Sequence, residues 1–194
     1  MSRRVRIFED EIIAKRVFTQ LKRASKSTFK YKNNYQKKAY EGSNEVVVKI
    51  TGNSKNFEGV KAHINYITRK NELEIKVDES ESYKGKQEIN EFKEIIKNEG
   101  AGKEKREMMH MVFSMRNKKS INKDKLMKAA MQTVKQKYPN NLSAFVHHAD
   151  TNNPHIHTII KIKDEQGKRL DIRKKDLAEL RINFAKELNK LGIE

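Results

Sequence analysis

The most distinctive feature of the sequence is a group of histidines: four of the six lie within the eleven residues from His147 to His157. His155 and His157 are separated by one residue, so in an extended strand their side chains share one face. Three neutral imidazoles bind a divalent metal ion at ~2.0–2.2 Å and leave coordination positions open. Because an open position lets a metal ion polarise a phosphoryl oxygen, the group predicts chemistry on a phosphate ester. Asp150 lies between the histidines and can accept a hydrogen bond from a ligand ring, fixing its tautomer.

Two strands must position these side chains. Ser143–His148 and His155–Lys163 both have strand patterns, and the connection between them is short enough to make them antiparallel neighbours. His148, at the end of the first strand, then supplies the third imidazole. The alternate positions of the second strand, Ile156 to Ile162, are mostly apolar, so we expect the imidazoles to point away from the main core. The alternative interpretation is a polar hairpin whose histidines are only solvated.

The rest of the chain alternates between strand and helix patterns. Strands are predicted at 46–50, 73–77 and 108–115, a polar loop at 80–85, and a short extended segment at 169–172. Helices are predicted at 59–69, around 89–96 with an end at Gly100, at 126–138, and at 177–191 with Gly192 as the stop. Hairpin spacing near the end and helices elsewhere favour an antiparallel or mixed sheet covered by helices.

Composition narrows the class of protein. The 194 residues include 43 Lys and Arg against 26 Asp and Glu, a formal net charge of +17. So large a basic excess on one small core points to a polyanionic partner, most commonly nucleic acid. Cysteine is absent, which excludes disulfides, thiolate metal sites and cysteine nucleophiles. No apolar run is long enough for a membrane span and no secretory signal is evident, so we expect a cytosolic protein.

The first 44 residues form a separate basic segment with 12 Lys or Arg against 4 acids. Apolar residues spaced by four from Ile13 to Ala24 predict one helix, and a basic stretch with Tyr31, Tyr35 and Tyr40 follows. The segment is either a solvated tail or an arm that orders on DNA. The predicted division is therefore 1–44 for this arm and 45–194 for the main domain.

Three segments resemble the motifs of a known family. Residues His148 to His157 read H-x-D-x-x-N-x-H-x-H, which resembles the third motif of relaxases, the mobilisation nucleases that nick plasmid DNA at a transfer origin. Tyr66 to Lys70 is similar to the first motif with its tyrosine nucleophile, and His110 to Ser114 to the second with its serine. The segments occur in the family's order, and the resemblance covers about Val46 to Gly192. The most similar subgroup is the single-tyrosine relaxases that include the T-DNA nicking protein of Agrobacterium.

The resemblance implies an HUH endonuclease fold, which is an α+β fold with a central antiparallel sheet that carries the histidines and is flanked by helices. It also implies a metal-dependent, site- and strand-specific DNA endonuclease and strand transferase. It implies Mg²⁺ or Mn²⁺ as the metal ion, with Zn²⁺ possible in vitro. Asp150 or a histidine takes the phenol proton, and both options stay open. Asn153 fits the motif and also suits the turn before Pro154. The implied site residues are the nucleophile Tyr66, the metal ligands His148, His155 and His157, the catalytic residues Asp150 and Ser114, and the DNA contacts Arg69, Lys70 and Asn153.

The resemblance also implies partners and a location. The partners are single-stranded DNA at the transfer origin, accessory relaxosome proteins and the coupling protein of a type IV secretion system. The location is the bacterial cytoplasm, with translocation into a recipient cell alongside the DNA.

Several of these assignments have alternatives. Tyr66 lies about 120° from the apolar stripe of its helix, so it need not be a core ring, whereas Tyr138 falls on such a stripe. Tyr83, in the polar loop, is the rival nucleophile. Ser114 is otherwise a small hydroxyl on a half-buried face, and His110 is either a neighbour of the metal ligands or a hydrogen-bonded sheet histidine.

Two other functions compete with conjugative nicking. Rolling-circle initiators and transposases of the same superfamily usually carry their tyrosine on a helix after the histidines, but the helix at 177–191 has none. The other alternative is a non-catalytic basic module that binds nucleic acid and whose histidines are structural.

Overall fold

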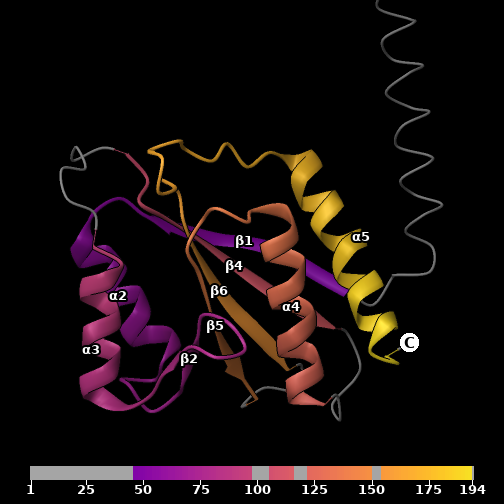
Figure 1. Ribbon diagram of the computed structural model, residues 1–194, viewed down its shortest axis with the longest axis horizontal. Coiled ribbons are helices and arrows are strands. Elements are labelled where there is room, and N and C mark those ends of the chain that lie inside the picture. The colour runs from indigo at the N-terminus through magenta and orange to yellow at the C-terminus, as the bar shows by residue number, and fades with distance from the viewer. Residues whose placement is uncertain (1–45, 98–104, 116–121, 150–153, 194) are drawn as a thin grey trace, which may run out of the picture. The chain divides into compact units, whose positions relative to one another are not determined.

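The computed structural model describes residues 46–97, 105–115, 122–149 and 154–193. Their strands form one six-stranded antiparallel sheet in the order β1-β4-β6-β5-β2-β3 (Figure 1). The strands are β1 (Val46–Ser54), β2 (Ile75–Lys76), β3 (Ser82–Tyr83), β4 (Met108–Met115), β5 (Ser143–His148) and β6 (His155–Lys161). The predicted α+β fold with a central antiparallel sheet is therefore confirmed. The predicted boundary at residue 45 stays a prediction, because the arm lies outside the described residues.

Helices cover both faces of this sheet. Those among the described residues are α2 (Phe57–Ile67), α3 (Gly85–Ile95), α4 (Lys123–Lys137) and α5 (Lys174–Lys190). Helices α4 and α5 pack on one face and α2 and α3 on the other (Figure 1). Phe113 and Phe184 belong to the first core, and Ile64 and Ile159 to the second. None of the described helices is long and apolar enough to cross a membrane.

Strand β4 lies between β1 and β6, and its side chains alternate between the two cores. Met111 and Phe113 face α4 and α5, whereas Met108 lies in the core beneath α2 and α3. The two-residue period predicted for this strand is confirmed, because its side chains divide between the cores.

The histidine face of β6 points away from the main core, as predicted, because Ile156 and Ile160 on the opposite face lie in the first core. A second core, which the sequence did not predict, covers part of the histidine face. Ile159 shares the face of His157 and is 1% exposed in the second core. Helices α2 and α3 cover only part of this face, because His155 and Ser114 remain half-buried. The histidines therefore lie where the helical cover ends.

Helix α2 begins and ends two residues earlier than predicted. It begins early because the side-chain oxygen of Asn56 accepts a hydrogen bond of 2.8 Å from the amide of Gly59, which caps the helix. It ends at Ile67 because three residues after Thr68 adopt positive φ angles, which no helix accommodates.

Other boundaries also differ from the predictions. The strand predicted at 73–77 has only the two residues of β2, and the polar loop at 80–85 contains β3. Helix α3 ends at Ile95, and Gly100, the predicted stop, lies outside the described residues. The strand predicted to reach Lys163 ends at Lys161, and the extended segment at 169–172 contributes a single bridge, between Lys163 and Arg169.

Candidate active site

The register of β5 and β6 brings three histidines together at one end of the two strands. His148 is directly opposite His155, and His157 follows on the same face. Their ring centroids are 4.3–5.2 Å apart. Each ring offers one nitrogen, and these three nitrogens lie within 4.8 Å of one another. The prediction that a third imidazole reaches the pair is thus confirmed in its geometry.

The donor set of this histidine cluster fits a divalent metal ion. Nε2 of His155 and Nε2 of His157 are 3.2 Å apart. This is the separation expected of two nitrogens that bind the same metal ion at ~2.0–2.2 Å. Burial, followed by the neighbouring His148 and His155, lowers the pKa of His157 to about 3. His157 is therefore neutral at physiological pH, which is the form that binds metal ions.

The third histidine connects this cluster to helix α2. Nε2 of His148 donates a hydrogen bond of 2.6 Å to the carbonyl oxygen of Ile67. That bond places the proton on Nε2 and leaves Nδ1 as the ligand atom, an arrangement common among metal-binding histidines. Nη2 of Arg69 lies 3.4 Å from Nδ1, so a guanidinium lies next to the proposed ligand atom.

Tyr66 projects from α2 beside the histidine cluster. Its side chain is 58% exposed, which confirms that it is not a core ring. Its ring and that of His157 are in an edge-to-face arrangement, with centroids 5.9 Å apart and planes at 86°. The Arg69 guanidinium lies 5.9 Å from the centre of the Tyr66 ring. The phenol and the proposed metal ligands, 91 residues apart for Tyr66 and His157, thus share one site.

A strained turn follows the tyrosine. Arg69, Lys70 and Asn71 have φ angles of 51°, 59° and 76°, a left-handed region that costs most L-residues about 1–2 kcal/mol each. The amide of Lys70 donates to the carbonyl of Asn65 at 2.8 Å, and the amide of Asn71 donates to the side chain of Thr68 at 3.1 Å. These bonds hold the turn and direct Arg69 back toward the cluster.

Ser114 lies next to the histidines on the neighbouring strand. It is directly opposite His155 in the β4–β6 pairing. Its hydroxyl donates to the carbonyl of Pro154 at 3.1 Å, so it positions the start of β6. The other two predicted site residues, Asp150 and Asn153, lie outside the described residues.

The rival tyrosines are placed elsewhere. The hydroxyl of Tyr83 donates to Glu81 at 2.6 Å, and that bond raises the pKa of Tyr83 to about 12. Tyr83 is on the edge strand β3, which the order of the sheet separates from β6. Tyr138 is 7% exposed and burial raises its pKa, which confirms it as a packing residue.

One site neighbour was missed in the sequence. His63, one turn before Tyr66, stacks on His110 with ring centroids 3.5 Å apart. The only local signal was the three-residue spacing that places His63 and Tyr66 on the same side of α2. His110 itself is a hydrogen-bonded sheet histidine, with Nε2 3.0 Å from the hydroxyl of Ser54.

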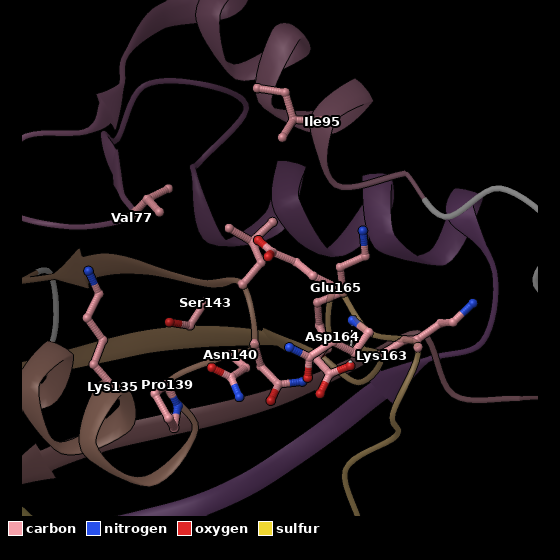
Figure 2. A pocket seen from close by; sticks show the side chains of 14 residues that line it. Val77, Ile95, Lys135, Pro139, Asn140, Ser143, Lys163, Asp164 and Glu165 are labelled. Carbon is pink, nitrogen blue, oxygen red and sulfur yellow. Dashed lines mark hydrogen bonds between the residues drawn. The ribbon is translucent and has the colours of Figure 1, made fainter.

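A pocket of about 840 Å³ lies away from this site (Figure 2). Its lining includes Ser143, where β5 begins, and Lys161, where β6 ends. Val77 and Ile95 line the opposite side. The histidines are at the other end of both strands. The pocket therefore contains none of the predicted site residues.

Comparison with known proteins agrees with this geometry. The family model described as relaxase, MobA/VirD2-like, nuclease domain, matches residues 66–191, more than half of the chain. The match begins at Tyr66 and includes Ser114 and all three clustered histidines. No curated protein matches the sequence. The chain belongs to the family of MobA/VirD2-like relaxases and contains their nuclease domain.

Proposed function

We propose that this protein nicks one strand of DNA at a transfer origin and later rejoins it, by metal-assisted attack of Tyr66 on the scissile phosphate. The observation that carries the proposal is the position of Tyr66, whose exposed ring is in an edge-to-face arrangement with His157 of the histidine cluster. A nucleophile beside three imidazoles is the arrangement that phosphoryl transfer to a phenol needs.

The reaction is a transesterification. The phenol oxygen of Tyr66 forms a bond to phosphorus while the bond from phosphorus to the 3′ oxygen breaks, leaving a 5′-phosphotyrosine and a free 3′-hydroxyl. A free phenol has a pKa of ~10 and must lose its proton to attack. The acceptor of that proton is Asp150 or a histidine, and the leaving 3′ oxygen takes up a proton to become the free hydroxyl. Because one phosphoester replaces another, the step is reversible and needs no nucleotide hydrolysis.

The remaining site residues bind the DNA and the metal ion. We propose that His148, His155 and His157 hold Mg²⁺ or Mn²⁺, with Zn²⁺ as an in vitro substitute. A metal ion there would polarise the phosphoryl oxygen and stabilise its charge. Ser114 contacts the strand near the nick, while Arg69, Lys70 and Asn153 contact its backbone.

The biological role that we propose is plasmid mobilisation by a single-tyrosine relaxase of the HUH type, similar to the T-DNA nicking protein. The proposed partners are the single-stranded origin, accessory relaxosome proteins and a type IV coupling protein. The protein would act in the bacterial cytoplasm and pass into the recipient cell with the DNA. Its basic first 44 residues would bind the single-stranded DNA.

Two alternatives have less support. Replication initiators and transposases of the superfamily usually carry their tyrosine after the histidines, but α5, the helix that follows them here, has none. A non-catalytic DNA-binding module would give no reason for a mostly exposed tyrosine to lie against the histidine cluster.

The test is covalent adduct formation. Single-stranded oligonucleotides tiled across the DNA that flanks the gene are incubated with the protein and Mg²⁺ or Mn²⁺, and adducts are separated under denaturing conditions. We expect an adduct that is lost in Tyr66→Phe and His155→Ala and is retained in the matched control Tyr83→Phe. EDTA should abolish the adduct but weaken binding less, since affinity rests mainly on phosphate contacts. An adduct that persists in Tyr66→Phe would refute the nucleophile, and no adduct on any origin would favour the binding module.

A further inference from the structure

Helix α2 carries an aromatic contact that the proposed reaction does not use. His63 stacks on His110 of β4 with ring centroids 3.5 Å apart and planes within 1° of parallel. The next ring along the helix is Tyr66, with its centroid 6.1 Å from that of His63. Tyr66 in turn is in an edge-to-face arrangement with His157. The four rings form a row in the order His110, His63, Tyr66 and His157. Its first and last members are on strands of the sheet, and the two between them are on α2.

His110, at one end of this row, is held in place by the sheet. His110 is 7% exposed, and its Nε2 is 3.0 Å from the hydroxyl of Ser54, which is 5% exposed. Both residues are on paired strands, because Ser54 ends β1 and His110 lies in β4. The ring on which His63 stacks is therefore fixed by backbone pairing and by a buried hydrogen bond.

The other attachments of α2 lie on the neighbouring face of the helix and at its last turn. Val60, Ile64 and Ile67 form the buried stripe that packs into the second core. His148 bonds the carbonyl of Ile67, at the end of the helix. At ~100° per residue, His63 and Tyr66 lie ~60° apart around the axis. The stack with His110 therefore restrains the side of the helix that carries the phenol.

We propose that His63 is a positioning residue for Tyr66: by stacking on His110 it sets the rotation of α2 and so holds the phenol ring against His157. The inference rests on the proposed function, in which Tyr66 is the nucleophile. A displacement of the reacting oxygen by about 1 Å costs up to about 100-fold in rate. Burial lowers the pKa of both stacked histidines to about 4, so the two rings are uncharged at neutral pH and do not repel each other.

Three substitutions at His63 separate stacking from proton transfer. His63→Phe keeps a flat ring without ring nitrogens, His63→Gln keeps polar atoms without a ring, and His63→Ala removes both. We expect the single-turnover rate of adduct formation at saturating oligonucleotide to fall about tenfold or more in the Ala and Gln variants. The Phe variant should stay within about threefold of the unsubstituted protein, and oligonucleotide affinity should be unchanged in all three. Equal rates in all variants, or a Phe variant as slow as the Ala variant, would overturn the proposal.

A second measurement needs no activity. NMR spectra of protein labelled on tyrosine and histidine rings should show a nuclear Overhauser effect between Tyr66 and His157, with the Tyr66 signal assigned from Tyr66→Phe. We expect this effect to be present in the unsubstituted protein and in His63→Phe and to be lost in His63→Ala. If it persists in His63→Ala, the positioning role is wrong. If the unsubstituted protein forms no adduct on any oligonucleotide, the proposed function fails, while this spectrum still decides the role of His63.

Discussion

Nε2 of His148 donates a hydrogen bond of 2.6 Å to the carbonyl oxygen of Ile67, the residue that follows Tyr66. The proposed metal ligand on β5 is thereby bonded to the end of the helix that carries the proposed nucleophile. One imidazole serves both parts of the site, because Nε2 fixes the helix while Nδ1 faces the cluster. His148 is 1% exposed, so this bond is shielded from water.

Substitutions at His148 should separate these two roles. His148→Ala leaves the Ile67 carbonyl without this donor, and we expect a loss of about 1–3 kcal/mol in the free energy of unfolding. His148→Gln offers an amide donor in the same region and should lose less. Both variants should lose the stabilisation that Mn²⁺ gives the unsubstituted protein in thermal unfolding. Equal stability of the two variants in EDTA would show that the hydrogen bond does not hold the helix.

Arg69 should have opposite effects on metal ion and DNA. Its Nη2 lies 3.4 Å from Nδ1 of His148, where its charge opposes a cation. We expect Arg69→Ala to bind Mn²⁺ a few-fold more tightly, because Coulomb repulsion falls, and to bind single-stranded DNA about tenfold more weakly, because a phosphate contact is lost.

Lys70→Ala is the matched control for Arg69→Ala. Lys70 is exposed on the same turn, so its removal should weaken DNA binding and leave the affinity for Mn²⁺ unchanged. Calorimetry for the metal ion and fluorescence anisotropy for the oligonucleotide supply both affinities. A weaker affinity for Mn²⁺ in Arg69→Ala would contradict the proposed competition at Nδ1.

Much of the fold followed from local patterns. The two-residue period of β4, β5 and β6 predicted which side chains share a face. The short connection between β5 and β6 predicted that these two strands pair, so the sequence alone predicted the histidine cluster. The lengths of β2 and β3 could not be predicted, because pairing at the edge of a sheet depends on tertiary neighbours. The second core was not predicted, because the alternation along β6 identified Ile156 and Ile160 as the core side and gave no sign that Ile159, on the histidine face, is also covered.

The parts of the site that depend on distant contacts could not be predicted. His63 and His110 are 47 residues apart, and no local periodicity indicates that their rings stack. The positive φ angles at Arg69, Lys70 and Asn71 fall on residues other than glycine, so composition did not predict the sharp turn that directs Arg69 to His148. Tyr66 was identified from its motif, while its contact with His157 depends on how α2 packs on the sheet.

The strained turn predicts a stabilising substitution. Lys70 has φ 59°, which glycine adopts without steric cost. We expect the free energy of unfolding of Lys70→Gly to exceed that of Lys70→Ala by about 1 kcal/mol. The two variants are comparable because both lose the charge and both keep the amide that bonds Asn65. Urea denaturation measures the difference. If the glycine variant is the less stable one, the turn is not strained.

Stability should depend on pH through the stacked histidines. Burial lowers the pKa of His63 and His110 from 6.5 to about 4. Between pH 6.5 and 4 the unfolded chain therefore binds more protons than the folded one, so this contribution is complete above pH 6.5 and is lost as the pH falls toward 4. The groups facing His63 are Tyr66 on its own helix, His110 on β4 and His157 on β6.

His63→Phe removes one of these titrating groups, so its melting temperature should fall less steeply than that of the unsubstituted protein from pH 7 to pH 4.5. Both proteins are measured in EDTA, so that no metal ion contributes. Parallel curves would show that His63 has the same pKa in the folded and unfolded chains.

The most direct test of the central claim is to locate the DNA on the protein. After reaction with the origin oligonucleotide and nuclease trimming, trypsin releases residues 62–69 as a peptide with Tyr66 as its only tyrosine, and residues 77–84 as one with only Tyr83. Tandem mass spectrometry should find the nucleotide phosphate on peptide 62–69, at Tyr66 and stable to acid. A nucleotide on peptide 77–84, on any other residue, or on no peptide at all would contradict the assignment of Tyr66 as the nucleophile.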